Sequence, residues 1–249
     1  MCGFLGTLSE FSHSSFLAAL DLISHRGPDQ TGYLSFDYSR RTLRLGFKRL
    51  SIQDLTPNGN QPMVSNNKRF VLLFNGEIYN FHELRSQLKS LGYTFNSRCD
   101  TEVLLNAWCE WGVDCLPKLD GMFAFCVFDS VDNTLTLVRD SFGIKPLYYF
   151  NSPSLLGFSS EINPLLSSLN IPRQINTDTS LTYLCDGSFD RSPDTFFKGI
   201  KRLMPGSLIQ FSLTSLQVLT HRPWYTPSTF ESASLSYSDS CDHFRHLFH

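Results

Sequence analysis

The chain has 249 residues, of which 41% are hydrophobic and 18% charged, and its formal net charge is −2. This composition is typical of a soluble globular protein with one large domain or two small ones, and the balanced charge argues against nucleic acid or an anionic membrane as a partner. No basic segment followed by an apolar run opens the chain, and no stretch reaches the roughly 18 apolar residues that span a bilayer, so we expect neither a secretory signal nor a membrane segment.

Patterns of apolar residues predict short strands and a few helices, in the following order. Strands are predicted at 3–8, 32–36, 43–47 and 70–74, and helices over the Phe16, Leu20 and Ile23 face, over 81–91, and from Asp100 to Gly112. A hairpin is predicted from 122–128 and 134–138, followed by strands near 147–150 and 155–159 and a helix near 161–168.

Strands that are joined by tight turns pair antiparallel, so the fold class we expect is α+β, with helices packed on antiparallel sheets. We assign residues 2–211 to one domain. Residues 212–249 are expected to form a C-terminal strand, a Ser/Thr/Pro-rich linker and the start of a further domain. The last residues, from Cys241, have the pattern of a beginning helix.

The cysteines are odd in number, and no two form a Cys-x-x-Cys pair. They are Cys2, Cys99, Cys109, Cys115, Cys126, Cys185 and Cys241. This arrangement argues against a disulfide framework or a zinc site, and no other spacing matches a known ligand set, so we expect no metal and a reducing, cytoplasmic location.

Cys2 is the first candidate for chemistry. If an aminopeptidase removes Met1, one residue has both a thiol and a free α-amine. The thiol is a nucleophile, and an amine with a pKa of about 8 can serve as its base. The alternative is a small apolar side chain that happens to be second in the chain.

Further polar residues gather in clusters between apolar elements. The clusters are 49–53, 75–80, 100–102 and 139–148. Asn75 and Gly76 follow an apolar strand, and together offer two hydrogen-bond donors with little bulk, as an oxyanion requires; a plain turn is the alternative. Arg49 is able to bind a carboxylate through two parallel hydrogen bonds, or to lie on the surface.

Two acidic residues complete the set. Asp100 is suited to pair with a substrate ammonium, although capping of the predicted helix explains it equally well, and Glu77 either assists or braces the loop. An amide to attack, a carboxylate clamp and an ammonium partner together describe free glutamine.

These residues stand in motifs that resemble one family. The motifs are Met1-Cys2-Gly3, Arg26-Gly27-Pro28-Asp29, Arg49-Leu50-Ser51-Ile52, Gln61-Pro62, Phe74 to Asn80, Asp100-Thr101-Glu102, Leu119 to Phe125 and Arg139 to Tyr148. In this order they resemble the N-terminal glutaminase domain of asparagine synthetase, a class II glutamine amidotransferase, from Cys2 to about Tyr225.

The resemblance implies an N-terminal-nucleophile (Ntn) hydrolase fold, in which two antiparallel sheets are sandwiched between helix layers. It implies Cys2 as nucleophile and Asn75 and Gly76 as the oxyanion hole. The residues that it implies for L-glutamine binding are Arg49, Leu50, Ser51, Ile52, Gln53, Asn75, Gly76, Glu77 and Asp100. It also places the Arg26–Asp29 loop beside the site, and we interpret the Arg139–Lys145 turn as structural.

The implied function is release of ammonia from L-glutamine for ATP-dependent asparagine synthesis from aspartate. The Ser-Gly-Gly-x-Asp-Ser loop of an ATP-pyrophosphatase domain does not occur in the sequence. We therefore expect no cofactor in this chain, with ATP and Mg²⁺ used by a synthetase domain or subunit that receives the ammonia. An apolar face toward that partner is expected to favour a homodimer in isolation.

Three alternatives stay open. The same half-reaction serves amidotransferases with other acceptors, such as a sugar or a peptide. A catalytically silent module with the same fold is a second possibility. A papain-like Cys/His enzyme is the third, with His25 as the histidine beside a motif.

Overall fold

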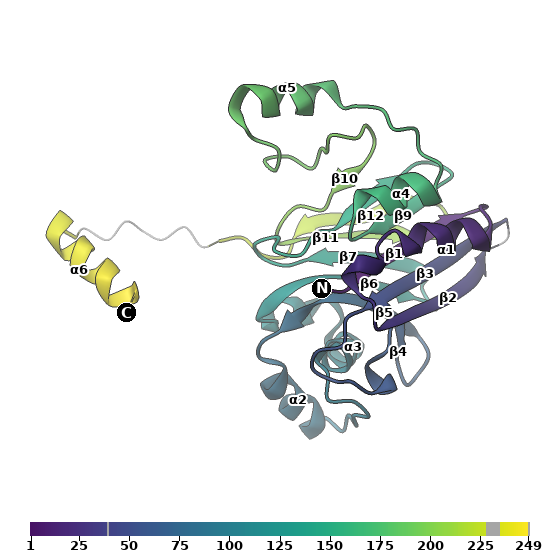
Figure 1. The fold of residues 1–249 in the computed structure, drawn as a ribbon. Coiled ribbons are helices and arrows are strands. Elements are labelled where there is room, and N and C mark those ends of the chain that lie inside the picture. Colours follow the sequence, from purple (N-terminus) through teal and green to yellow (C-terminus); the bar gives the residue numbers. More distant parts are fainter. Residues whose placement is uncertain (39, 228–234, 249) are drawn as a thin grey trace.

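Two six-stranded antiparallel sheets lie face to face in the computed structural model, which describes residues 1–38, 40–227 and 235–248 (Figure 1). The first sheet has the order β10-β8-β9-β1-β3-β2. Its strands are β1 Gly3–Ser9, β2 Gln30–Tyr38, β3 Arg41–Arg49, β8 Tyr148–Asn151, β9 Leu156–Ser159 and β10 Lys201–Arg202. The central strand β1 begins directly after Cys2, so that residue lies at the N-terminal end of a central strand.

The second sheet has the order β12-β11-β7-β6-β5-β4. Its strands are β4 Met63–Val64, β5 Phe70–Ile78, β6 Gly121–Asp129, β7 Thr134–Arg139, β11 Ser207–Ser212 and β12 Val218–Pro223. Strand β5 pairs with β6 along its whole length, from Phe70 opposite Asp129 to Ile78 opposite Gly121.

Helices cover the outer faces of both sheets (Figure 1). Helices α1 (His13–Asp21) and α4 (Ile162–Ser168) pack on the first sheet, and α2 (Phe81–Ser90) and α3 (Asp100–Trp111) pack on the second. Helices α5 (Thr177–Asp186) and α6 (Tyr237–Phe248) have no buried residue. Short 3-10 turns cover Ser24–Arg26 (η1), Pro57–Gly59 (η2) and Gly112–Lys118 (η3). In the described part of the chain, no helix combines the length and the apolar character that crossing a membrane requires.

Strand alternation in β5 shows how the two layers form. Val71 and Leu73 point into the core between the sheets, whereas Leu72 and Phe74 point to the core beneath α2 and α3. A buried side chain of this size contributes about 1.5–3 kcal/mol relative to an exposed one. Both faces of β5 are therefore fixed by packing, which holds the polar residues at its end in one register.

The expected fold class and layer arrangement are confirmed, as are the predicted helices and the hairpin. One prediction differs. The strand predicted to end at Phe74 continues to Ile78, because β6 pairs with it across Asn75 and Gly76. The C-terminal strand expected within residues 212–249 is β12, Val218–Pro223, which pairs with β11. Residues 228–234 of the predicted linker lie outside the described residues, and the domain boundary after residue 211 stays a prediction.

Candidate active site

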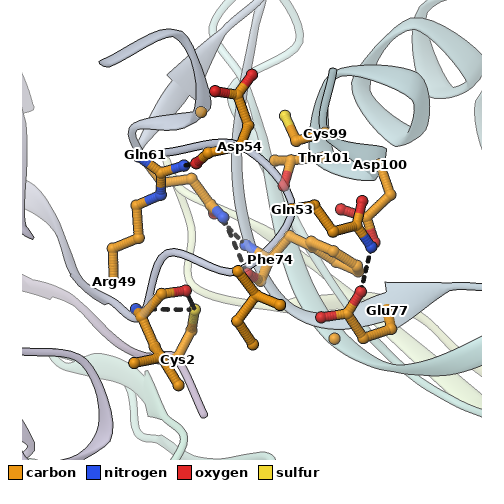
Figure 2. Close-up of a pocket in the computed structure, with 14 residues that line it drawn as sticks. Cys2, Arg49, Gln53, Asp54, Gln61, Phe74, Glu77, Cys99, Asp100 and Thr101 are labelled. Atoms are coloured by element: carbon orange, nitrogen blue, oxygen red, sulfur yellow. Dashed lines mark hydrogen bonds between the residues drawn. The ribbon is translucent and has the colours of Figure 1, made fainter. Parts of the chain in front are cut away.

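A cavity of about 40 Å³ opens where the start of β1 meets the end of β3, the second half of β5 and the start of α3 (Figure 2). Its lining residues are Cys2, Arg49, Leu50, Ile52, Gln53, Asp54, Gly59, Gln61, Phe74, Gly76, Glu77, Cys99, Asp100 and Thr101. This volume is enough for a few water molecules. Residues from three of the four polar clusters in the sequence thus meet at Cys2.

The main chain of Leu50 holds the Cys2 thiol. The Leu50 N–H donates to Sγ at 3.4 Å, and the thiol contacts the Leu50 carbonyl oxygen at 3.5 Å. Burial raises the pKa of the Cys2 thiol above its ordinary value, while the Leu50 hydrogen bond and the nearby positive charges of the N-terminus and Arg49 oppose that shift. A thiol held in this form needs a base to become the nucleophile.

The loop from Arg26 to Asp29 lies beside this thiol, as the resemblance implies. Arg26 ends η1, is buried, and donates from Nε to the carbonyl oxygen of Cys2 at 2.9 Å. Asp29 accepts a hydrogen bond from the Ser51 N–H at 2.7 Å. One loop therefore holds both the main chain of the nucleophile and the segment that follows β3.

One edge of β5 supplies the amide of Gly76. Alternation along the strand turns the amides of Phe74, Gly76 and Ile78 away from β6, toward the same edge. The Phe74 N–H donates to Oε1 of Gln61 at 2.6 Å, and the Ile78 N–H donates to Oδ2 of Asp100 at 2.9 Å. The Gly76 amide lies between these two occupied donors, in the part of β5 that lines the cavity.

Asn75 lies on the opposite face of β5, beneath the cavity rather than in its lining. It is 1% exposed, and its position shares the inter-sheet face with Leu73, against which core Cys2 also packs. Its Nδ2 has no acceptor among the described residues. A buried amide donor without a partner is rare in native structures, and this one is free to donate to a group that binds at the site.

Asp100 and Glu77 form the acidic end of the cavity. Asp100 is 4% exposed, and burial, reinforced by the negative charge of Glu77, raises the pKa of its carboxyl to about 7. Glu77 accepts a hydrogen bond from the Gln53 side-chain amide (Figure 2). Asp100 is the first residue of α3 and Cys99 is its N-cap, and the Asp100 carboxylate accepts from the Ile78 amide and also interacts with the Thr101 amide at the start of the helix.

Arg49 lines the cavity, but much of its guanidinium is already bound. Nη1 donates to the Thr56 carbonyl oxygen at 3.0 Å and to Oδ1 of Asn60 at 2.8 Å, and Nη2 donates to the Asp54 carbonyl oxygen. Arg49 is 6% exposed, so the surface alternative for this side chain is wrong. It organises the loop between β3 and β4.

The other predicted binding residues divide between two hollows. Leu50, Ile52 and Gln53 line the cavity at Cys2, whereas Ser51 lines a neighbouring hollow with Asp29. Sequence reasoning missed Asp54, Gly59, Cys99 and Thr101 as lining residues. It also missed the function of Gln61, although Gln61-Pro62 stood among the motifs. Nothing local indicates that the Gln61 side chain forms hydrogen bonds with the main chain of Phe74, 13 residues later in β5.

The Arg139–Lys145 turn between β7 and β8 is held by many internal hydrogen bonds. The Asp140 carboxylate accepts from the main-chain amides of Phe123, Phe142, Ile144 and Lys145. Arg139 donates to three carbonyl oxygens of the same region, those of Lys145, Gly143 and Leu203. These contacts support the structural interpretation of this motif.

With this geometry established, comparison with known proteins defines the class. The family model described as "Glutamine amidotransferase domain" matches residues 1–225, so the chain belongs to that family. Among curated relatives, asparagine synthetase [glutamine-hydrolyzing] 1 of Bacillus subtilis is 36% identical over 232 residues, which are 90% of this chain and 35% of the relative. Asparagine synthetase [glutamine-hydrolyzing] 3 of the same organism is 35% identical over 92% of this chain and 36% of its own length.

The chain therefore spans about a third of the length of these relatives. A solved structure of glutamine phosphoribosylpyrophosphate amidotransferase from B. subtilis superimposes with a TM-score of 0.63 and 16% sequence identity, over 91% of this chain and 50% of that one. This similarity shows the fold, and it agrees with the expected Ntn arrangement of two antiparallel sheets between helices.

Proposed function

We propose that this chain hydrolyses the side-chain amide of L-glutamine at Cys2 and releases ammonia for ATP-dependent synthesis of asparagine from aspartate. The observation with the most weight is the convergence in one cavity of the Cys2 thiol, the Gly76 amide, which faces away from β6, and the acidic pair Asp100 and Glu77. Family membership and two curated relatives named for glutamine-dependent asparagine synthesis support it.

The thiol is the nucleophile in this proposal. Once Met1 is removed, the α-amine of Cys2 takes the thiol proton, and Sγ attacks the side-chain carbonyl carbon of glutamine. The carbonyl π electrons move to oxygen, and the Gly76 amide and the Asn75 side chain donate hydrogen bonds to that oxyanion. The ammonium form of Cys2 then protonates the departing nitrogen, and ammonia leaves a glutamyl thioester.

Water completes the cycle. It attacks the thioester carbon while the α-amine takes a proton from it, the C–S bond breaks, and the Cys2 thiolate recovers that proton. Glutamate leaves, and the residue returns to its starting state. No further oxidant, reductant or cofactor is needed for this half-reaction.

Binding of glutamine is assigned to both ends of the cavity. The α-ammonium is placed at Asp100 and Glu77, where burial would strengthen an ion pair, and the α-carboxylate at Arg49 and the main chain of residues 50–53. Because Arg49 already donates to three loop oxygens, only its remaining donors are available to the carboxylate.

Use of the ammonia is a proposal about a larger assembly. We assign it to a synthetase domain or subunit that binds ATP and Mg²⁺, which this chain is not expected to bind. A cytoplasmic location and a homodimer are further proposals. The seven cysteines are all free in the structure, which supports a reducing location.

Glutaminase activity of the processed protein tests the core of this proposal. Glutamate and ammonia should appear in equal amounts, and Cys2→Ala should remove the activity, whereas Cys185→Ala, which changes an exposed cysteine of α5, should retain it. Labelling of Cys2 by 6-diazo-5-oxo-L-norleucine is expected in the same sample. Hydrolysis that survives Cys2→Ala would contradict the proposal.

A further inference from the structure

We infer that Glu161 is a positioning residue for the nucleophile: it fixes Arg26, and Arg26 holds the main chain of Cys2. The inference deepens the proposed function and rests on it for the catalytic consequence. Glu161 stands far from Cys2 in the sequence, outside every motif that indicated the site, and between β9 and α4 in the fold.

Arg26 joins the two residues directly. Its Nε donates to the carbonyl oxygen of Cys2 at 2.9 Å, and its Nη1 donates to Oε1 of Glu161 at 3.1 Å. The Arg26 side chain is only 9% exposed, so this ion pair is largely shielded from water on the arginine side. His25 Nε2 lies 2.9 Å from the same Oε1, but its side chain is 62% exposed and its contact is at the surface.

Gly3 lets the guanidinium reach the main chain. A Cβ at position 3 would lie 2.9 Å from Cδ of Arg26 and 3.1 Å from its Nε, which is closer than normal packing allows. The aliphatic part of Arg26 therefore lies against the Cys2-Gly3 segment. The absence of a side chain at this position is a requirement of the contact and not of backbone dihedral angles.

The backbone beside Glu161 is fixed to β1. The Ser160 N–H donates to the carbonyl oxygen of Phe4 at 3.0 Å, and the Phe4 N–H donates to Oγ of Ser160 at 3.1 Å. Oγ of Ser159 also donates to the Phe4 carbonyl oxygen. The segment that contains Glu161 is therefore fixed to Phe4 of β1 by its neighbours Ser159 and Ser160. Glu161 also contacts Cys2 through Arg26, so the first residues of β1 are held at two points.

These two contacts matter because the nucleophile and the proposed base belong to one residue, Cys2. If the α-amine of Cys2 is the base, the position of one short main-chain segment sets both groups against the substrate carbonyl. A misplacement of about 1 Å costs on the order of 100-fold in rate. Without Glu161, Arg26 would keep a buried charge with no carboxylate to oppose it, and Nη2 already has no acceptor among the described residues.

The test compares Glu161→Ala and Glu161→Gln with the unmutated protein, after removal of Met1. Asp132→Ala is the matched control, because Asp132 also accepts from an arginine, Arg69, but in the β6–β7 turn. Three quantities are measured: kcat and KM for glutamine, the rate of Cys2 alkylation by iodoacetamide from peptide mass spectrometry, and Tm. Alkylation of the exposed Cys185 in the same sample is the internal reference.

We expect Glu161→Ala to lower kcat by about 10- to 100-fold, with KM changed less than about threefold, because the residues assigned to glutamine lie on other elements. The ratio of Cys2 to Cys185 alkylation should change in this variant. Glu161→Gln keeps an oxygen for Nη1 and should recover most of the loss, and Asp132→Ala should match the unmutated protein in all readouts.

A merely structural function would give another pattern. A lower Tm with an unchanged kcat per labelled Cys2, and an unchanged alkylation ratio in Glu161→Ala, would overturn the inference. Failure of the proposed function is a distinct result, in which the unmutated protein neither hydrolyses glutamine nor reacts with 6-diazo-5-oxo-L-norleucine. The alkylation ratio still tests Glu161 in that case, because iodoacetamide needs no glutamine site.

Discussion

Leu50 meets the Cys2 thiol with both of its main-chain polar groups, at 3.4 Å from the N–H and 3.5 Å from the carbonyl oxygen. The residue after β3 thereby ties the nucleophile to the loop that forms one wall of the cavity. Arg49, directly before it, holds that loop through the carbonyl oxygens of Asp54 and Thr56. Movement of the loop and placement of the thiol are coupled by these contacts.

The unpartnered amide of Asn75 leads to the first prediction. Asn75→Ala removes one of the two proposed oxyanion donors, so kcat should fall on the order of 100-fold or more, with KM for glutamine nearly unchanged. Steady-state kinetics of glutamate formation measures both. Asn106→Ala is a suitable control, because Asn106 is likewise buried with an unpartnered Nδ2 but lies on α3, outside the cavity lining. An equal loss in both variants would contradict the specific function of Asn75.

Asp100 gives a prediction about pH. Burial and the charge of Glu77 raise the pKa of its carboxyl to about 7, so the empty cavity holds it increasingly protonated below that pH. A substrate ammonium binds the ionised form, and binding therefore favours loss of the proton. KM for glutamine should fall by about tenfold from pH 6 to pH 8, since the apparent affinity follows the fraction of the competent form.

Asp100→Asn supplies the control for that measurement. The amide keeps an oxygen for the Ile78 N–H, so β5 and α3 stay joined. KM should be high and nearly independent of pH over the same interval. A variant that keeps the tenfold change would assign the titration to another group.

Gln61 gives a prediction about stability. Its side chain pairs with the main chain of Phe74 in both directions, at 3.0 Å and 2.6 Å, and it is 5% exposed. Gln61→Leu fills a similar volume but leaves a buried N–H and a buried carbonyl without partners, at a cost of about 1–3 kcal/mol for each. Urea unfolding should show a lower free energy of unfolding. A midpoint equal to that of the unmutated protein would show that water replaces the Gln61 amide at no cost.

Local signals predicted most of the fold because each is a property of neighbouring residues. The alternation in 70–74 and the helical face of Leu84 and Leu88 both survive in the packed structure. One feature depended on a distant partner instead. The extension of β5 through Ile78 follows from pairing with β6, and that partner is not visible in the segment itself.

The same distinction applies to the site. Cys2, Gly76, Glu77 and Asp100 were predicted from motifs, and the structure brings them into one cavity. The partners of these residues were not predicted. Gln61 acts on a strand that begins nine residues later, and Glu161 reaches Arg26 across 135 positions. Such positioning residues have no local pattern, because their function is defined only by what the folded chain places beside them.

The mass of Cys2 after reaction with 6-diazo-5-oxo-L-norleucine tests the central claim most directly. Two forms of the protein are compared by peptide mass spectrometry, one that begins at Cys2 and one in which an uncleaved N-terminal tag precedes Cys2. The account predicts one adduct on Cys2 of the processed form, prevented by excess L-glutamine, and little or none on the blocked form, whose α-amine is no longer that of Cys2. Equal labelling of both forms, or a processed form that remains unlabelled, would contradict it.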